Sequence, residues 1–281
     1  MCERLAGAPV ASAIIAGCKA DIGALAARGV TPKIVIARLG ECEDDAAYER
    51  AAVKRCETAG IMAGRVSLPE STVGILEIID GLNADKSVHG ILLLRPLPKT
   101  VDEAAVCERV APEKDVDGIT SLSLTGVFTG RETGFAPCTA QACVEILDHY
   151  GIAIAGRRAV VVGRSLVVGK PAAMLLLARH ATVTVCHTRT ADLRAECKRA
   201  DILIAAAGQA KLLDETYLSP DQYVVDVGIH MTGDGSMCGD VAADCATAPV
   251  KGLTPVPGGV GTVTTSLLVR NTVTAAMRMT G

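Results

Sequence analysis

The stretch Ala159-Val160-Val161-Val162-Gly163-Arg164-Ser165-Leu166-Val167-Val168-Gly169-Lys170-Pro171 decides the fold. It opens as a β-branched run typical of a strand, passes through a glycine-bearing loop and ends on a proline suited to a first helical turn. This order is what a dinucleotide site requires, because glycine lets the backbone approach phosphate and a helix N-terminus offers free N–H groups. The pattern is Gly-x-Ser-x-x-x-Gly-x-Pro rather than Gly-x-Gly-x-x-Gly. On this segment alone, a plain strand–turn–helix capped by Ser165 therefore stays an alternative.

The end of the next expected strand, His187-Thr188-Arg189-Thr190, bears on the choice of cofactor. NAD sites carry an Asp or Glu there, about 20 residues after the loop, to bind the ribose hydroxyls. This chain has no acid before Asp192, whereas Arg189, Thr188 and Arg164 of the loop suit a 2′-phosphate. The sequence therefore predicts NADP rather than NAD, with an ordinary polar strand end as the alternative.

Strand-like and helix-like segments alternate along the chain, which predicts an α/β fold with parallel sheets. The 281 residues suffice for one large or two ordinary domains. We expect strands at residues 33–39, 61–68, 88–94, 159–162, 181–186, 202–206 and 223–227. We expect helices near residues 44–58, 74–83, 139–150, 171–179, 193–199 and 264–279. Residues 118–134 are polar and without clear periodicity, and we interpret them as a connection.

Composition excludes several classes of partner. The chain carries 28 Lys+Arg against 31 Asp+Glu, a formal net charge of −3, whereas a nucleic-acid footprint needs a basic surplus or patch. With four Tyr, two Phe and no Trp, the core must be aliphatic and base-stacking platforms are not expected. The longest unbroken apolar runs, such as residues 91–94 and 159–162, are strand-sized. They fall short of the ~18 residues of a membrane span, so we expect neither a nucleic-acid nor a membrane partner.

The eleven cysteines form no Cys-x-x-Cys pair and are odd in number, so we interpret them as small buried hydrophobes rather than a disulfide framework or a metal site. The first residues lack a basic region followed by an unbroken apolar one, so no signal peptide is expected. Both observations predict a reducing, cytoplasmic location.

Several motifs in one order point to a known family. They are Lys114-Asp115-Val116-Asp117-Gly118, Pro137-Cys138-Thr139, Gly163-Arg164-Ser165 with Val168-Gly169-Lys170-Pro171, Asp226-Val227-Gly228-Ile229, Gly239-Asp240-Val241 and Thr254-Pro255-Val256-Pro257-Gly258-Gly259-Val260-Gly261. Over essentially its whole length the chain resembles the methylenetetrahydrofolate dehydrogenase/cyclohydrolase family, the bifunctional FolD proteins.

The resemblance implies two α/β domains with a cleft between them. An N-terminal folate domain spans residues 1–138 and is completed by the last helix, residues 264–281; a Rossmann-type NADP-binding domain spans residues 139–263. It also implies a homodimer that acts on tetrahydrofolate one-carbon derivatives in one-carbon metabolism, including purine biosynthesis. By similarity, the cofactor contacts are Gly163, Arg164, Ser165, Gly169, Thr188, Arg189 and Ile229.

The same resemblance assigns the folate side. Tyr48 and Asp117 are the expected catalytic residues, Tyr48 as a ring against the folate and Asp117 as the carboxylate that binds the pterin. The expected substrate contacts are Tyr48, Ala52, Leu93, Leu94, Arg95, Asp117, Pro257, Gly258, Gly259, Val260 and Gly261. Read alone, Lys114–Asp117 would be a solvated turn and Pro257-Gly258-Gly259 a plain turn.

The chain departs from the family pattern at two acid–base positions. The family has Tyr-x-x-x-Lys in a helix, and here Ala52 stands where the Lys belongs. Lys54 lies about 240° round the helix from Tyr48 and faces away, while Arg55 returns to that face one turn further on. Leu94 replaces a family Gln, followed by Arg95, which points to the other side of the strand. Ser123 replaces an Asn, and Ala140, His230 and Thr262 are smaller deviations.

These departures affect the two family activities unequally. Hydride transfer depends on positioning and on cofactor chemistry, and needs no protein base. Hydrolysis of the methenyl product requires proton transfers that Ala52 and Leu94 cannot perform. The sequence predicts an NADP-dependent methylenetetrahydrofolate dehydrogenase with weak or no cyclohydrolase activity. The alternatives are a fully bifunctional enzyme in which Arg55, Arg95 or a water compensates, and a non-catalytic folate-binding protein.

Overall fold

A computed structural model of the chain describes residues 2–40, 42–233 and 235–281. The chain divides into two compact units. The dinucleotide unit comprises the residues up to Ala11 together with Thr139–Thr264, and the folate unit comprises Ser12–Cys138 together with Thr265–Gly281. Two long helices, α1 (Gly7–Ala27) and α9 (Val260–Thr280), each begin in the dinucleotide unit and end in the folate unit.

The dinucleotide unit is built on a six-stranded sheet in the order β1-β11-β8-β7-β5-β6. All its pairings are parallel. The strands are β1 (Glu3–Arg4), β5 (Arg158–Val162), β6 (Thr182–Cys186), β7 (Ile202–Ala205), β8 (Tyr223–Asp226) and β11 (Gly252–Leu253). From β5 the chain builds outward to β6 and then crosses to β7. The strand order therefore reverses between β5 and β7, which is where doubly wound sheets bind ligands, outside the carboxyl ends of the strands.

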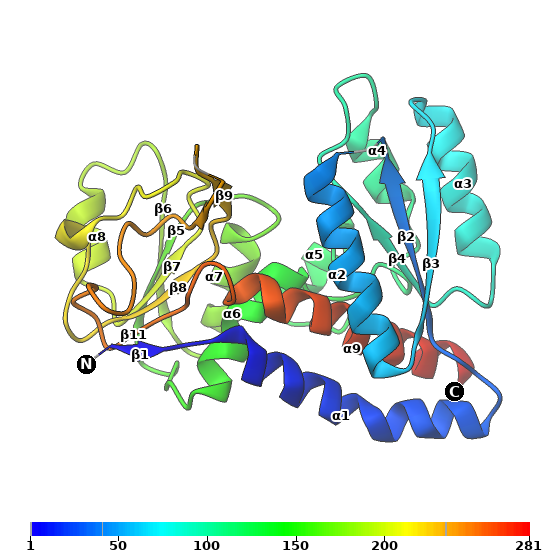
Figure 1. Cartoon of the computed structure of the whole chain (residues 1–281), viewed down its shortest axis with the longest axis horizontal. Coiled ribbons are helices and arrows are strands. Elements are labelled where there is room, and N and C mark those ends of the chain that lie inside the picture. Colours follow the sequence, from blue (N-terminus) through cyan, green and yellow to red (C-terminus); the bar gives the residue numbers. More distant parts are fainter. Residues whose placement is uncertain (1, 41, 234) are drawn as a thin grey trace. The chain divides into compact units, whose positions relative to one another are not determined.

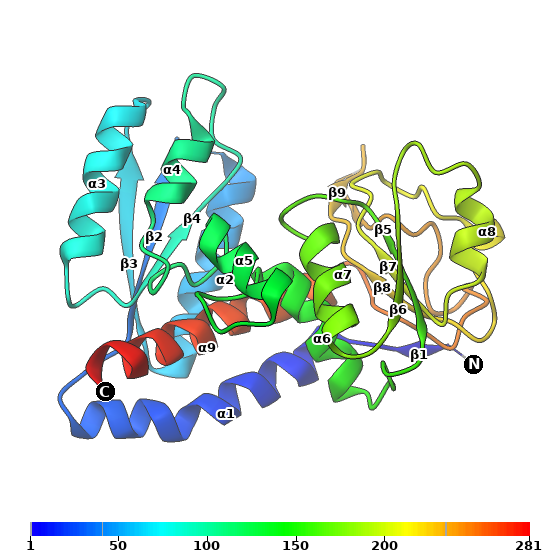
Figure 2. The same ribbon diagram turned by 180° about the vertical axis from the view of Figure 1, so that it is seen from behind.

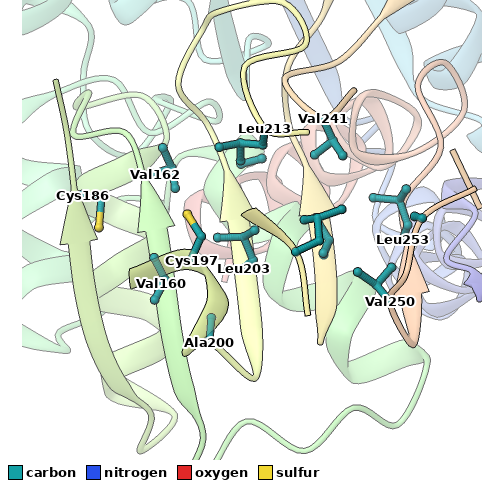
Figure 3. Packing of buried hydrophobic residues seen from close by; sticks show 14 residues of the cluster. Val160, Val162, Cys186, Cys197, Ala200, Leu203, Leu213, Val241, Val250 and Leu253 are labelled. Atoms are coloured by element: carbon teal, nitrogen blue, oxygen red, sulfur yellow. The ribbon is translucent and has the colours of Figure 1, made fainter. Parts of the chain in front are cut away.

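Helices α6 (Cys138–His149), α7 (Gly169–Ala178) and α8 (Leu193–Lys198), the short 3-10 helix η1 (Glu215–Tyr217) and the hairpin β9 (His230–Met231) with β10 (Met237–Cys238) complete the unit. The core on one side of the sheet is aliphatic, as the composition predicts. Figure 3 shows Val160 and Val162 of β5, Leu203 of β7 and Cys197 of α8 within one cluster. Each of these residues is buried, so the apolar strands hold the carboxyl edge of the sheet in place.

The folate unit is built on a three-stranded parallel sheet in the order β3-β2-β4. Its strands are β2 (Lys33–Leu39), β3 (Met62–Leu68) and β4 (Gly90–Leu93). Helix α2 (Glu43–Ala59) covers one face of this sheet, and α3 (Thr72–Ala84) and α4 (Glu103–Arg109) cover the other (Figures 1 and 2). Val35, Ile79 and Val106 belong to the cluster between the sheet and α3 and α4.

The structure corrects the prediction that residues 118–134 are a connection, because α5 (Ser121–Thr129) lies within them. The Thr120 hydroxyl accepts a hydrogen bond from the Ser123 N–H at the start of α5, and Gly130 ends the helix at φ 69°. Local capping thus makes a helix from a polar sequence that has little apolar periodicity. The last helix also begins at Val260, not at residue 264.

Helix α1 was not expected from the sequence. Among the described residues, α1 is the one helix that is both long enough and apolar enough to cross a membrane. Only 28% of its most apolar 18-residue stretch is buried in the structure. The prediction that the longest apolar runs are strand-sized therefore overlooked it. Length and composition alone are weak evidence, because core helices of soluble proteins pass the same test.

The eleven cysteines are all free thiols, and seven of them are buried. Burial raises the pKa of Cys56 to about 12 and that of Cys107 to about 11, so both thiols stay protonated. For these seven the interpretation as small buried hydrophobes describes their setting, whereas Cys42 is exposed and Cys2, Cys238 and Cys245 are half-buried.

Candidate functional site

The loop between β5 and α7 is shaped by two glycines. Gly163 has φ +129°, and a Cβ there would collide with the backbone carbonyl of Ala206. A Cβ at Gly169 would likewise collide with the carbonyl of Gly163. Since only glycine fits at either point, the loop passes close to the end of β7 and enters α7 directly. This is the close backbone approach that a phosphate-binding loop requires.

Ser165 caps the same loop. Its hydroxyl oxygen accepts hydrogen bonds from the N–H groups of Val168, at 3.1 Å, and Gly169, at 3.4 Å. Ser165 therefore closes the turn that leads into α7, whereas Val168 is the N-cap residue of the helix. The Ser165 side chain is exposed, which fits a cofactor contact. Arg164 is exposed beside it.

The turn after β6 holds the expected ribose-binding residues. The Thr190 hydroxyl accepts from the His187 N–H at 2.9 Å, and the His187 Nδ1 accepts from the Arg189 N–H at 3.1 Å, which leaves Thr188 and Arg189 exposed. Asp192, the nearest acid, accepts from the Ala195 N–H at 2.9 Å and caps α8. With that carboxylate used as a cap, the exposed side chains at this turn are cationic and hydroxylic, which fits a 2′-phosphate.

The chain's own residues therefore fit a dinucleotide. Gly163 and Gly169 form a cradle that any Cβ would fill, and α7 begins directly after it. An exposed arginine follows each of the strands β5 and β6. The residues that would hold the cofactor are Gly163, Arg164, Ser165, Gly169, Thr188 and Arg189. Ile229, which follows β8, is 59% exposed on the same carboxyl edge of the sheet.

Helix α2 presents the first group of expected folate residues. Tyr48 is half-buried and Ala52, one turn later, is 2% exposed. Lys54 is exposed and Arg55 half-buried, as the helical spacing indicates. The helix is held to the sheet by Glu49, whose carboxylate pairs with Arg65 of β3 at 2.7 Å and Arg38 of β2 at 3.3 Å.

The end of β4 presents the second group. Leu93 is 2% exposed and Leu94 6% exposed, and the Leu94 N–H donates to the Ala37 carbonyl at 2.9 Å. The Arg95 guanidinium instead reaches Glu103 at the start of α4, with 3.6 Å between Nη1 and Oε1. At the position where the family resemblance leads us to expect a Gln, this chain has a buried aliphatic side chain.

Asp117 lies in a loop held by its own neighbours. The Lys114 ammonium donates to three carbonyls at the C-terminal end of α3, those of Leu82, Asn83 and Asp85, each at 2.8 Å. Asp115 is fully buried and accepts hydrogen bonds from the Ile119 and Thr120 N–H groups and from the Ser123 hydroxyl. The run is therefore not a solvated turn. Ser123, in place of the family Asn, supports the buried Asp115 rather than facing a ligand.

Asp117 itself is half-buried beside these residues. Burial raises the pKa of its carboxyl to about 7, against the opposing effect of the Arg95 guanidinium, and the neighbouring Asp115 charge adds to the rise. Asn271 of α9 donates to the Val116 carbonyl at 2.8 Å and so ties the last helix to the same loop. A carboxyl with a pKa near neutrality is able to exchange a proton.

The structure divides the expected 257–261 loop. Pro257, Gly258 and Gly259 form a turn, while Val260 and Gly261 already belong to the first turn of α9. The Gly7 N–H donates to the Gly258 carbonyl at 2.8 Å. A cavity of about 600 Å³ in the dinucleotide unit is lined by Pro257 together with Arg4, Lys211, Asp226 and Cys238, among others. None of the six residues named above as holding the cofactor lines it.

Sequence reasoning missed the role of two buried carboxylates, Asp226 and Asp240. Both lie in motifs that carry the family resemblance, but a motif match does not show that a side chain accepts hydrogen bonds from backbone N–H groups. Asp226 accepts from the N–H groups of Gly228, Asp240 and Val241, and burial raises its pKa to about 6. Asp240 is fully buried and accepts from the turn after β7. Their burial became visible only in the folded chain.

Comparison with known proteins places the chain. Residues 5–117 match the catalytic domain of tetrahydrofolate dehydrogenase/cyclohydrolase, and residues 137–280 match its NAD(P)-binding domain. The chain is 46% identical to the bifunctional protein FolD of Carboxydothermus hydrogenoformans, over 100% of this chain and 99% of that one. It is 43% identical to the Clostridioides difficile FolD, over 97% and 96%.

Solved structures agree. The FolD methylenetetrahydrofolate dehydrogenase/cyclohydrolase of Campylobacter jejuni superposes with a TM-score of 0.94 at 35% identity, covering 99% of both chains. The Trypanosoma brucei enzyme, complexed with NADP and an inhibitor, gives 0.92 at 32% identity, covering 99% of this chain and 98% of that one. The predicted fold, enzyme class and dinucleotide cofactor are thereby confirmed. The chain belongs to the tetrahydrofolate dehydrogenase/cyclohydrolase family.

Proposed function

We propose that the protein oxidises 5,10-methylenetetrahydrofolate to 5,10-methenyltetrahydrofolate with NADP, and that it hydrolyses the methenyl product weakly or not at all. One observation carries the proposal. The backbone cradle of the dinucleotide unit is intact, whereas the two positions expected to supply proton transfer on the folate side are the buried aliphatic residues Ala52 and Leu94.

The roles of the chain's residues follow from this division. The backbone at Gly163 and Gly169 admits the phosphates, and Arg164 and Arg189 are exposed to pair with a 2′-phosphate. Tyr48 offers a ring to the folate, and Asp117 accepts N–H bonds from the aminopyrimidine edge of the pterin. NADP, when bound, supplies the hydride acceptor. The charge left on the one-carbon bridge is stabilised by the substrate's own nitrogens, so the chain's task is to orient and to exclude water.

A second candidate is the fully bifunctional enzyme that also releases 10-formyltetrahydrofolate. The observation in its favour is Asp117, because a carboxyl with a pKa of about 7 can donate and accept a proton near neutral pH. Arg55, half-buried on the face of α2 that carries Tyr48, cannot act as a base, since its guanidinium stays charged. If hydrolysis survives, we expect Asp117 to take part in its proton transfer.

One assay separates the two candidates. Methylenetetrahydrofolate is supplied with NADP or, in a parallel run, with NAD, and both the reduced cofactor and the methenyl product are followed. Under the first proposal the methenyl product accumulates in step with NADPH, and NAD supports a slower reaction. Hydrolysis of added methenyltetrahydrofolate far above the buffer rate would show that the second candidate is right.

We also propose how the protein assembles and where it acts. We infer a homodimer, as the family resemblance implies, supported by β6 as an uncovered edge strand with Val185 39% exposed and Leu177 of α7 52% exposed beside it. A cytoplasmic location, and a place in the one-carbon supply that includes purine biosynthesis, are supported by the free thiols and by the family, respectively.

A further inference from the structure

The turn after β7 is organised around a carboxylate rather than around solvent. Three consecutive N–H groups, those of Ala207, Gly208 and Gln209, donate to Asp240, at 2.6, 3.0 and 3.0 Å. Gly208 takes φ +68°, which turns the N–H groups toward one point. Such a concave run of N–H groups is an anion-binding arrangement, and here the protein supplies the anion from its own buried side chain.

Asp240 is itself held by the end of β8. Its N–H donates to Asp226 Oδ1 at 3.0 Å, and the Val241 N–H donates to Asp226 Oδ2 at 2.9 Å. Residue 239 must be glycine for this approach, because a Cβ there would collide with the Asp226 carboxylate. The two carboxylates therefore tie the turn after β7 to the loop after β8.

His230 closes the arrangement. Its Nε2 lies 2.8 Å from Asp240 Oδ1, and its side chain is 22% exposed. On the other side of Ile229, the Gly228 N–H donates to Asp226 Oδ1 at 2.9 Å. Both neighbours of Ile229 are thus tethered to a buried carboxylate, while Ile229 itself stays 59% exposed.

The tethered segments lie where the cofactor is expected. Ala206, which precedes the turn, is the residue whose carbonyl faces Gly163 of the nucleotide loop. The end of β7 borders the switch point of the strand order, and β8 is its next neighbour in the sheet. Movement of either segment would shift the surface on which the dinucleotide lies.

We propose that His230 and Asp240 are positioning residues for the cofactor. The His230 N–H donates to the Asp240 carboxylate, which holds the turn formed by residues 207–209. The same hydrogen bond fixes the position of the exposed Ile229, which precedes His230. This inference rests on the proposed NADP-dependent function. It requires a donor at the position of the His230 Nε2 and does not require a group that changes charge. An amide nitrogen at the same distance from the backbone meets that requirement, whereas an aliphatic side chain of similar size does not.

The test compares His230→Leu with His230→Gln in the full-length protein. The dissociation constant of NADP is measured by calorimetry without folate, and kcat and KM are measured for each substrate. In His230→Leu we expect NADP binding to weaken ~10-fold, with the KM for methylenetetrahydrofolate and the Tm little changed. His230→Gln should stay within about twofold of the parent. His149→Leu, a change at an exposed histidine of α6, serves as the control.

The possible results separate this inference from the proposed function. Equal NADP binding in the parent and His230→Leu overturns the positioning role, and so does equal loss in His230→Leu and His230→Gln. A fall in folate affinity or Tm that matches the loss of NADP binding shows general damage and also overturns it. If the parent binds NADP but forms no NADPH from methylenetetrahydrofolate, the proposed function fails, while the binding comparison still decides the role of His230.

Discussion

The carboxyl edges of the two sheets use side chains in opposite ways. At the edge of the six-stranded sheet, the backbone of the Gly163 loop would bind the ligand, and Ser165, Asp226 and Asp240 hold backbone N–H groups in place. At the edge of the three-stranded sheet, the expected contacts are side chains, and two of them have become the buried Ala52 and Leu94. The fold of the loops at the first edge depends on these glycine and aspartate residues.

This contrast between the two edges teaches that, on the folate side, the residues expected to react can change without altering the fold. Ala52 of α2 is buried, and the buried Leu94 continues the apolar run of β4, so aliphatic side chains at both positions add to the apolar area removed from water. On the dinucleotide side, a comparable replacement would leave buried N–H groups without partners. We therefore expect the folate side to tolerate redesign and the dinucleotide side to resist it.

The largest expected effect comes from restoring polar groups to the folate side. The double variant Ala52→Lys with Leu94→Gln should raise hydrolysis of methenyltetrahydrofolate ~10²-fold, because general acid–base catalysis contributes at least that much. The rate is read from loss of the methenyl chromophore. The matched control, Ala51→Lys with Leu94→Gln, places the lysine at an exposed position of α2 and should show no gain. Equal rates in the two double variants would contradict the assigned positions.

The next effect tests the backbone cradle. Gly163→Ala introduces a Cβ against the Ala206 carbonyl, at a residue with φ +129°, so the loop must move. We expect NADP affinity to fall ~10- to 100-fold, as measured by calorimetry. Gly156→Ala is the control, since its φ of +75° is also positive but nothing lies within 4 Å of its Cβ. Comparable loss of NADP binding in both variants would mean that strain alone, not close approach, explains the effect.

The smallest effect concerns charge at the folate side. Because the pKa of Asp117 rises from 3.8 to about 7 in the folded protein, its carboxyl opposes folding increasingly as the pH rises between those values. Asp117→Asn removes that penalty, so its Tm relative to the parent should increase by a few degrees from about pH 5 to about pH 8.

The control for this prediction has no pH dependence in this window. The hydrogen bonds with Arg109 lower the pKa of Asp80 from 3.8, so Asp80 is ionised in the folded and the unfolded chain alike from about pH 5 to about pH 8. Asp80→Asn should therefore change the Tm by the same amount at every pH in that range. An equally flat difference for Asp117→Asn would contradict the raised pKa of Asp117. Thermal unfolding in buffers of matched ionic strength supplies both curves.

Much of the fold could be predicted from local pattern. The strand expected at residues 33–39 is found as β2 (Lys33–Leu39), and the others lie within three residues of their expected ends, because buried parallel strands are continuous apolar runs. Helix α5 was missed because its start depends on the Thr120 cap rather than on apolar spacing. The two-residue strands β1 and β11 were missed because a pair so short exists only through its neighbours. The domain boundary expected at residue 138 placed β1 in the folate domain, whereas β1 pairs with β11 in the sheet of the dinucleotide unit.

The sequence by itself determined the family, the glycine loop and the absence of a lysine and a glutamine from the expected acid–base positions, since each depends on residue type and spacing alone. Only the tertiary structure decided what surrounds each group. It buries Asp115, Asp226 and Asp240 as supports for backbone N–H groups, raises the pKa of the half-buried Asp117, and buries Ala52 and Leu94. Burial and hydrogen-bond partners arise from segments far apart in the chain, and so the chemistry of a carboxylate cannot be read from its neighbours in sequence.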